Sequence, residues 1–292
     1  MKITVTGAAG RLGRAVVKAL HAAGHQVAAT DQCFTRELPV GVEVLNLLDA
    51  DGCYRVLAGS EMVVHLGNVP GLNWTKPQRT YADSSVVNVN VFQAALDVGV
   101  RRIIYASSIQ VVNGSRTRDQ RGGTIPPSVL PYLPLDGHVP ANPGNLYAAG
   151  KVAAENLLAY YAKFHGLSAV SLRFPVLLAP DDAKYTLTQV QRQGLLDEGF
   201  SCLAMPDAAE LVAAVAAAEL PGFRIYLPAG PGTTLAPQSV EEIVAQYYPQ
   251  VPRRGQSEYD NLVDISEITR ETGWRPKVRL VPASPGIDRA TS

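Results

Sequence analysis

The fold is decided by residues 2–31, KITVTGAAGRLGRAVVKALHAAGHQVAATD, near the start of this 292-residue chain. A short β-rich run leads into glycines 7, 10 and 13, and apolar residues then recur at the three- and four-residue spacing of a helix. A second β-rich run follows at residues 26–30. Strand, glycine turn, helix and strand in this order predict a βαβ unit, the opening of a dinucleotide-binding sheet.

Each glycine of the turn has its own expected role. Gly7 permits the tight turn, Gly10 lets the backbone approach a pyrophosphate, and Gly13 lets the helix pack against the strand. The phosphates would bind at the helix N-terminus, where backbone N–H groups and the helix dipole attract an anion. Asp31 ends the second strand, and its carboxylate can accept a hydrogen bond from a ribose 2′-hydroxyl but would repel a 2′-phosphate. The stretch therefore predicts NAD as the cofactor in preference to NADP.

Strand and helix patterns alternate through the next part of the chain. The expected strands are 42–45, 62–66, 102–106 and 169–178, and the expected helices are 51–57, 84–98 and 146–165. This alternation predicts an α/β fold with a doubly wound parallel sheet, a Rossmann domain. Ligands of such sheets bind beyond the carboxyl ends of the strands, which places Ser107, Ser108 and the turn at residues 67–68 on the functional edge.

The pattern weakens after residue 180. The elements expected there are helices near 187–196, 207–219, 240–247 and 266–272 and a strand at 224–227. We expect residues 1–178, with a contribution from about 200–230, to form the NAD-binding domain. Residues 179–292 are expected to form a small substrate-binding lobe.

The composition limits the partners that the chain could have. It carries 26 basic and 26 acidic residues and no formal net charge, which argues against nucleic acid and against an anionic membrane. The three cysteines are scattered, without the spacing of a metal site or of a disulfide framework. The first strand begins at residue 2, and no apolar run approaches membrane-spanning length. We expect a cytoplasmic protein with no metal, no nucleic-acid partner and no membrane partner.

Tyr147 and Lys151 are one helical turn apart and project from the same face of the helix expected at 146–165. A phenol is a poor base because its pKa is about 10. A neighbouring ammonium, together with a positively charged nicotinamide ring, would bring this pKa toward working pH. Tyr147 could then accept a proton from a substrate hydroxyl while Ser108 holds the same oxygen. The alternative is a tyrosine that anchors the helix beside a solvated lysine, and the position of the pair after a serine-bearing strand favours the catalytic interpretation.

Further motifs occur in a characteristic order along nearly the whole chain. They are GxxGxxG, Asp31, Val64-His65-Leu66-Gly67, Asn88-Val89, Tyr105-Ala106-Ser107-Ser108, YxxxK, Leu172-Arg173-Phe174 and Thr272-Gly273-Trp274-Arg275-Pro276. Their combination resembles the extended short-chain dehydrogenase/reductase family, the NAD-dependent epimerase/dehydratases. The resemblance implies that Tyr147 is the acid/base and that Lys151 lowers its pKa and holds the nicotinamide ribose. It also implies that Ser108 is the catalytic serine and that Asn88 supports the active site.

The resemblance assigns the residues that contact the ligands. The implied cofactor contacts are Gly7, Ala9, Gly10, Arg11, Leu12, Gly13, Asp31, Asn46, Leu47, Leu66, Gly67, Asn68, Tyr147, Lys151 and Pro175. The implied substrate contacts are Val69, Ser107, Ser108, Ile109, Gln110 and Tyr147. Asn46 and Leu47 lie where the family contacts adenine, usually with Asp in place of Asn46. Arg173 is expected to be structural or to lie at the edge of the substrate site.

Two regions depart from the family pattern. The Arg- and Pro-rich segment 113–143 lengthens the connection between Ser108 and Tyr147, and it forms either a lid, whose arginines would favour an anionic substrate, or a solvated loop. The lobe after residue 180 is smaller than in members that act on nucleotide-linked sugars, which favours a compact substrate. The turn at residues 65–67 looks closest to the uronate dehydrogenase-like members, which oxidise free sugar acids. Ile109 and Gln110, however, stand where those members typically have Asn and His.

The sequence thus predicts an oxidoreductase that transfers a hydride between NAD and a carbinol of a sugar or sugar-derived substrate, favoured as a dehydrogenase of a compact free sugar or sugar acid. One alternative is a nucleotide-sugar epimerase or dehydratase that recycles NAD internally. Another is a dinucleotide-binding regulator without chemistry, against which the intact Ser108, Tyr147 and Lys151 argue. Helices 84–98 and 147–165 carry more apolar residues than one buried face requires, and the family pairs them in a four-helix interface, so a homodimer is expected.

Overall fold

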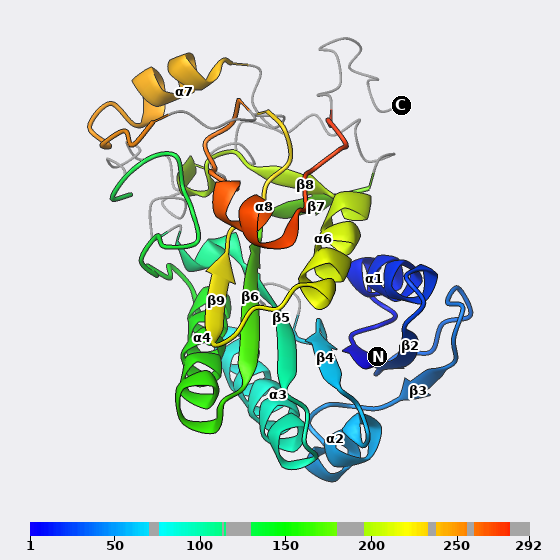
Figure 1. Cartoon of the computed structure of the whole chain (residues 1–292). Coiled ribbons are helices and arrows are strands. Elements are labelled where there is room, and N and C mark those ends of the chain that lie inside the picture. Colours follow the sequence, from blue (N-terminus) through cyan, green and yellow to red (C-terminus); the bar gives the residue numbers. More distant parts are fainter. Residues whose placement is uncertain are drawn as a thin grey trace, which may run out of the picture.

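The computed structural model describes residues 1–69, 76–112, 114, 130–179, 196–232, 238–255 and 260–280. Its centre is a seven-stranded sheet with the order β3-β2-β1-β4-β5-β6-β9, in which all neighbouring pairs are parallel (Figure 1). The strands are β1 (Lys2–Thr6), β2 (Gln26–Asp31), β3 (Val42–Val44), β4 (Met62–His65), β5 (Arg102–Ser108), β6 (Ser168–Phe174) and β9 (Phe223–Tyr226). The predicted doubly wound parallel sheet is confirmed. The order reverses between β1 and β4, so their carboxyl ends flank the point at which such sheets bind ligands.

Helices cover both faces of the sheet. Figure 1 shows α1 (Arg11–Ala22) and α6 (Met205–Ala217) together on one face, and α2 (Ala50–Leu57), α3 (Pro77–Asp97) and α4 (Leu146–His165) on the other. Each layer has its own apolar core: Val5 and Val16 belong to the first, and Val63 and Phe92 to the second. Strands covered on both faces are buried at successive positions, which explains why every residue of β4 is buried and why Thr4 and Thr6 of β1 are as buried as the apolar residues between them. Within the ranges given above, no helix is both long and apolar enough to cross a membrane.

The two longest helices differ in how well the sequence defines them. At the start of α4, Asn145 Oδ1 accepts the N–H of Ala148 at 2.7 Å, and at its end Gly166 adopts the left-handed conformation with φ of 67°. Both ends lie where the sequence predicts them. α3 begins at Pro77, earlier than the predicted start at residue 84. Proline suits the first turn of a helix, where its missing N–H is not needed.

The strand predicted at residues 169–178 is in fact two strands. β6 ends at Phe174, and β7 (Val176–Leu178) pairs with β8 (Cys202–Ala204) in a separate two-stranded sheet. Pro175 separates them because it has no N–H to donate to a neighbouring strand. The prediction of one continuous strand was wrong, and the break turns the chain out of the large sheet.

Beyond β8 the chain returns to the large sheet. α6 packs against α1, and β9 pairs with β6 at the edge of the sheet. α7 (Val240–Tyr247) and α8 (Ser266–Thr272) follow, at their predicted positions. The chain after α8 is held on α6, because the backbone N–H groups of Lys277 and Val278 donate to Asp207 Oδ2 at 3.1 and 2.9 Å. Most of the helix predicted near residues 187–196 lies outside the described residues.

The second half of segment 113–143 is built into the C-terminal part of the molecule. Residues 130–139, here called the strap, are joined to it at two points. Leu133 exchanges two backbone hydrogen bonds of 2.8 Å with residues 252–254, and Leu135 exchanges two of 2.7–2.8 Å with residues 262–264. The strap is therefore a buried part of the fold and not a solvated loop. The three arginines on which the lid hypothesis depends lie at residues 115–129, outside the described part of the chain.

Candidate active site

The glycine turn after β1 and the turn after β4 are in direct contact. Gly7 has a φ of +70°, which residues with a Cβ rarely adopt, and a Cβ added there would lie 2.5 Å from Gly67 N. A Cβ on Gly13 would overlap the carbonyl oxygen of Gly7. The positive φ of Gly7 fits the tight turn expected there, and the close approach at Gly13 fits its expected packing role.

The first turn of α1 and the end of β2 form a cradle for an anionic ligand. α1 begins after Gly10, and no side chain caps this end. Its first-turn N–H groups point out of the helix, where the helix dipole favours an anion. Beside them, Asp31 is held by two backbone donors, Ala9 N–H to Oδ2 and Cys33 N–H to Oδ1, both at 3.0 Å. The open helix end and the fixed carboxylate fit the pyrophosphate and the adenosine ribose of NAD.

The residues expected at adenine form a turn after β3. Asn46 Oδ1 accepts the N–H of Leu48 at 3.0 Å, so this side chain is engaged within its own turn. Leu47 is buried, and its side chain lies against Gly67. Asn90 of α3 donates to the carbonyl oxygen of Leu47 at 2.9 Å. Asn90 was not identified from the sequence, and it ties the turn to α3.

Tyr147 and Lys151 lie on consecutive turns of α4, beside the end of β5. Lys151 is 6% exposed, and its ammonium donates to the carbonyl oxygen of Ala106 at 2.6 Å. Its Nζ lies 4.8 Å from the centre of the Tyr105 ring and 5.6 Å from that of Tyr147. Ser108, the last residue of β5, accepts the N–H of Gln110 at 3.2 Å and lies near enough to Tyr147 to lower the pKa of its phenol. The structure thus brings the three predicted catalytic side chains together.

Burial dominates the electrostatics of this group. It lowers the pKa of Lys151 to about 7, against the opposing effect of the Glu155 carboxylate. It raises the pKa of Tyr147; the side chain of Ser108 acts in the opposite direction, and the Glu198 carboxylate raises the pKa further. The chain's own groups therefore do not produce the lowered phenol pKa that was expected from ammonium and nicotinamide together. Glu198, a buried residue between β7 and β8, was missed because no sequence spacing relates it to Tyr147.

A buried ion pair lies one helical turn beyond Lys151. Glu155 Oε2 accepts from Arg173 Nη2 at 2.8 Å, and its Oε1 accepts from Arg173 Nε at 3.1 Å. The same Oε1 accepts from the hydroxyls of Ser107 (2.8 Å) and Ser171 (3.0 Å). Arg173 is 3% exposed, which favours the structural of its two expected roles. Glu155 was missed, although its position four residues after Lys151 places it on the same helix face.

The predicted substrate residues differ in how their side chains are placed. The Ser107 hydroxyl is committed to Glu155, and Ile109 lies in the apolar core with 1% exposed. Gln110 accepts from Asn145 at 3.1 Å, beside the start of α4. Val69 is half-buried in the turn after β4. Their roles toward a substrate stay predictions.

Two further predicted residues, Asn88 and Pro175, lie on neighbouring elements. Asn88 of α3 is 2% exposed, and its Oδ1 accepts from Asn68 Nδ2 at 3.0 Å. Pro175 lies between β6 and β7, at the break described above. Asn88 therefore connects α3 to the turn after β4, and its catalytic role, like the cofactor contact of Pro175, stays a prediction.

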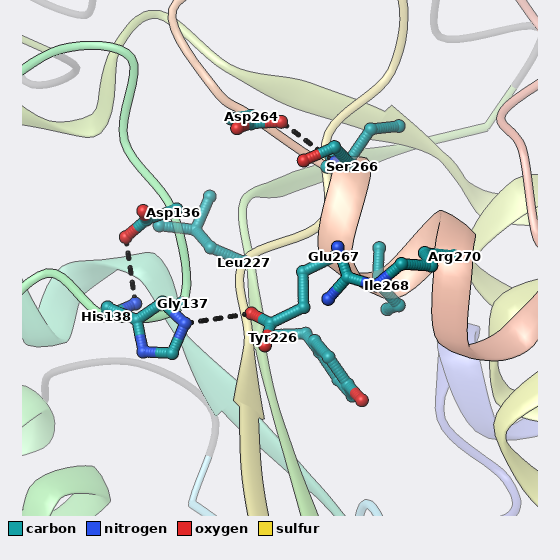
Figure 2. Close-up of a pocket in the computed structure, with 11 residues that line it drawn as sticks. Asp136, Gly137, His138, Tyr226, Leu227, Asp264, Ser266, Glu267, Ile268 and Arg270 are labelled. Atoms are coloured by element: carbon teal, nitrogen blue, oxygen red, sulfur yellow. Dashed lines mark hydrogen bonds and ion pairs between the residues drawn. The ribbon is translucent and has the colours of Figure 1, made fainter. Parts of the chain in front are cut away.

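A cavity of about 240 Å³ opens beside the strap. Figure 2 shows it lined by side chains from the strap, the end of β9 and α8, and its polar members are Asp136, His138, Asp264, Ser266, Glu267 and Arg270. His138 Nε2 and Glu267 Oε2 lie 3.0 Å apart across it. The lining contains none of the predicted catalytic residues, so this cavity is distinct from the candidate active site. Among the described residues, no three His, Cys, Asp or Glu side chains gather as metal ligands.

Residues 3–193 match the NAD dependent epimerase/dehydratase family, a span of more than half of the chain. The chain belongs to this family. It is 32% identical over 190 residues to L-arabinose 1-dehydrogenase (NAD(P)(+)) of Haloferax volcanii, with 63% of this chain and 70% of that protein covered. It is 26% identical over 178 residues to uronate dehydrogenase of Pseudomonas syringae pv. tomato, with 59% and 58% covered, so this match spans little more than half of that relative.

Solved structures share the fold over nearly the whole chain. A mutant uronate dehydrogenase from Agrobacterium tumefaciens, complexed with NAD, superposes with a TM-score of 0.66 at 21% identity, covering 99% of this chain and 91% of that one. The family and the cradle around Gly7 and Asp31 identify the chain as an NAD-dependent oxidoreductase of the extended short-chain dehydrogenase/reductase type.

Proposed function

We propose that this epimerase/dehydratase-family protein is an NAD-dependent dehydrogenase that oxidises a carbinol of a compact free sugar or sugar acid. One observation carries the proposal: Ser108, Tyr147 and Lys151 gather at the carboxyl end of β5, on the sheet edge that also carries the cofactor cradle. Two hydroxyls and an ammonium in this arrangement can hold one oxygen atom and remove its proton.

The residues divide the reaction between them. Bound NAD would accept the hydride from the carbinol carbon. Ser108 holds the substrate oxygen by its hydroxyl, and Tyr147 accepts the proton from that oxygen as the carbonyl forms. Lys151 stabilises the phenolate from the next turn of α4. Because the chain's own groups raise the pKa of Tyr147, we expect the phenolate to form only when the cofactor's positive charge and the Lys151 ammonium are both present.

The substrate class rests on relatives and on the size of the second lobe. The similar proteins include enzymes named for L-arabinose and uronate, and NAD-dependent glucose-6-phosphate dehydrogenase of Haloferax volcanii is 30% identical over 187 residues. We assign the NAD-binding domain to residues 1–178 together with about 200–230, which is supported by β9 in the large sheet and by α6 against α1. The remaining residues of 179–292 would form the substrate lobe.

The proposed assembly is a homodimer formed through α3 and α4. Large apolar side chains on these helices are exposed, among them Val86 (45%), Val89 (47%), Tyr160 (48%) and Phe164 (64%). Pairing α3 and α4 with their copies would bury this surface. The free thiols of Cys33, Cys53 and Cys202 support the proposal of a cytoplasmic protein without nucleic-acid or membrane partners, since a reducing compartment keeps thiols free.

A nucleotide-sugar epimerase is the second candidate. It is favoured by a 28% identity over 181 residues to UDP-glucose 4-epimerase of Corynebacterium glutamicum, of which 50% is covered. Such an enzyme would return the hydride to its product and release no NADH. A regulator without chemistry is a third candidate, and it would not need the Tyr147 phenol.

The proposal is tested by incubating the protein with NAD and a panel of neutral aldoses, uronic acids, sugar phosphates and nucleotide sugars. We expect NADH absorbance to rise with free sugars or uronic acids. Conversion of a nucleotide sugar without NADH would establish the epimerase instead, and NAD binding without turnover of any member would favour the regulator.

The variant Tyr147→Phe separates chemistry from binding in this experiment. Without the phenol oxygen no group accepts the substrate proton, so turnover should fall by about 10²- to 10⁴-fold. The Kd of NAD should stay within about threefold, because phenylalanine keeps the aromatic ring and removes only the phenol oxygen. Unchanged turnover would remove Tyr147 from the mechanism.

A further inference from the structure

A chain of hydrogen bonds runs through His65, a buried residue that the mechanism above does not use. On one side, His65 Nδ1 lies 2.7 Å from Thr6 Oγ1, which accepts the N–H of Gly67 at 3.2 Å. On the other side, His65 Nε2 lies 3.1 Å from Asn88 Oδ1. His65 is 1% exposed. Since Thr6 directly precedes Gly7, these hydrogen bonds join the glycine turn to α3.

One backbone group fixes the direction of every hydrogen bond in this chain. Val69 N–H can only donate, so the Asn68 side-chain atom that faces it at 2.8 Å is the oxygen. The other end of that amide is then the NH₂ group, which donates to Asn88 at 3.0 Å. Asn88 must therefore present its oxygen to Asn68, and it presents the same oxygen to His65.

His65 is consequently the tautomer that carries its proton on Nε2. The Asn88 oxygen can only accept, so Nε2 must supply the hydrogen. A neutral ring leaves Nδ1 as an acceptor, and the Thr6 hydroxyl donates to it while accepting from Gly67. The Val69 N–H thus determines which amide atoms of Asn68 and Asn88 are oxygens and which ring nitrogen of His65 carries the proton.

The surroundings keep the ring neutral. Burial lowers the pKa of His65 to about 3, and the ammonium of Lys151 on α4 acts in the same direction. On β5, Tyr105 stacks on the ring at 5.7 Å between centroids, and burial raises the pKa of this phenol well above its usual value. On α3, Phe92 meets the ring edge-to-face at 5.5 Å, and Asn88 has no charge.

We propose that His65 is a positioning residue for the cofactor, which links Asn88 on α3 to Thr6 on β1 and so holds the Gly67 turn against the glycine turn. The inference rests on the NAD site of the proposed function. The contact that it maintains is tight, because a Cβ at Gly7 would lie 2.5 Å from Gly67 N. If the Thr6 hydroxyl is lost, the Gly67 N–H loses its acceptor and the turn can shift relative to the cradle.

The first test observes the tautomer directly and needs neither NAD nor a substrate. Long-range proton–nitrogen correlation of ¹⁵N-histidine-labelled protein, with His65→Phe to assign the signal, should show a protonated Nε2 and a bare Nδ1. The signal should not move between about pH 5.5 and pH 8. A proton on Nδ1, or a titration in this range, would overturn the proposed direction of the chain.

The second test measures the Kd of NAD by calorimetry for matched variants. Thr6→Val keeps the size of the side chain and His65→Phe keeps an aromatic ring; both remove hydrogen bonds through His65, and they should weaken NAD binding by about 3- to 10-fold. Thr6→Ser keeps the hydroxyl and should bind within about twofold of the wild type. Thr4→Val is the control: Thr4 is a buried residue of the same strand whose hydroxyl bonds to Ser60 at 2.6 Å, outside the chain. It should lower the melting temperature and leave the Kd unchanged.

The outcomes separate positioning from simple structural support. Equal NAD affinities in all four variants, or equal losses in Thr6→Val and Thr4→Val, would overturn the positioning role. If the wild-type protein did not bind NAD at all, the proposed function and the positioning role would both fail, whereas the tautomer measurement would still report whether the hydrogen bonds run as described.

Discussion

Lys151 interacts with two buried polar clusters, one of which is charged and the other uncharged. The cluster around Glu155 and Arg173 contains two full charges, and it joins β5, β6 and α4. The chain through His65 contains no charge, and it joins β1, β4 and α3. A buried charge depends on its partner for its stability, whereas a neutral chain mainly fixes orientation. We therefore expect the first cluster to govern the stability of the molecule and the second to govern the position of its cofactor.

The largest effect is expected from Arg173→Met, which leaves the Glu155 carboxylate buried beside two serines. Removal of one partner of a buried ion pair costs about 3–5 kcal/mol in the free energy of unfolding. Urea unfolding measures this loss, and the double variant Glu155→Leu with Arg173→Met should recover a large part of it. A loss below about 1 kcal/mol in the single variant would mean that the two clusters do not differ as described.

A pH-dependent effect is expected from Lys151, which carries a charge between the two clusters. Its folded-state pKa of about 7 lies below the usual value of 10.5, so above pH 7 the folded protein has lost a proton that the unfolded chain retains. Stability from this group therefore rises as pH increases from 7 toward 10.5, and the penalty for burying the charge is fully present below 7.

The matched variant for this effect is Lys151→Met, which removes the charge at every pH. Its gain in unfolding free energy over the wild type should be larger at pH 6 than at pH 9, by about 2–3 kcal/mol. Chemical unfolding at both values measures the difference. A gain independent of pH would show that Lys151 does not titrate in this range.

A smaller loss of stability is expected when the uncharged chain of hydrogen bonds through His65 is interrupted. Thr6→Val removes one hydroxyl and should reduce the free energy of unfolding by about 1–2 kcal/mol, since no charge is left without a partner. The loss is again measured by urea unfolding, with Arg173→Met measured under the same conditions for comparison. If Thr6→Val proved as costly as Arg173→Met, the distinction between the charged and the neutral cluster would be lost.

The smallest effect is expected at Glu198, whose carboxylate raises the pKa of Tyr147. Glu198→Gln removes that charge, so the phenolate should form at lower pH. The acidic limb of the pH dependence of kcat/KM should move down by a fraction of a pH unit. An upward shift would contradict the assigned interaction, and Glu210→Gln, at an exposed position on α6, serves as the control.

The glycine turn of the cofactor site and the Tyr147–Lys151 pair could be predicted from local sequence. The strand, glycine turn and helix at residues 2–22 are encoded by short-range periodicity, and Tyr147 and Lys151 are brought together by a single helix. The charged and neutral clusters could not be predicted in the same way. His65 meets Thr6 only after β1 has paired with β4, and Glu155 meets Arg173 only after β6 has packed against α4. The break at Pro175 was missed because residues 169–178 are largely apolar on both sides of it, although β6 and β7 belong to different sheets. The strap was missed because its partners lie more than a hundred residues away.

The position of β9 has a consequence for synthesis on the ribosome. β9 closes the edge of the large sheet by pairing with β6, although it is made well after β6. Until residues 223–226 emerge, a nascent chain therefore displays the unpaired backbone groups of an apolar strand, which is a template for intermolecular pairing. Translation that stops before this point should yield an aggregating fragment, and chaperones that bind nascent chains should be needed most during this interval.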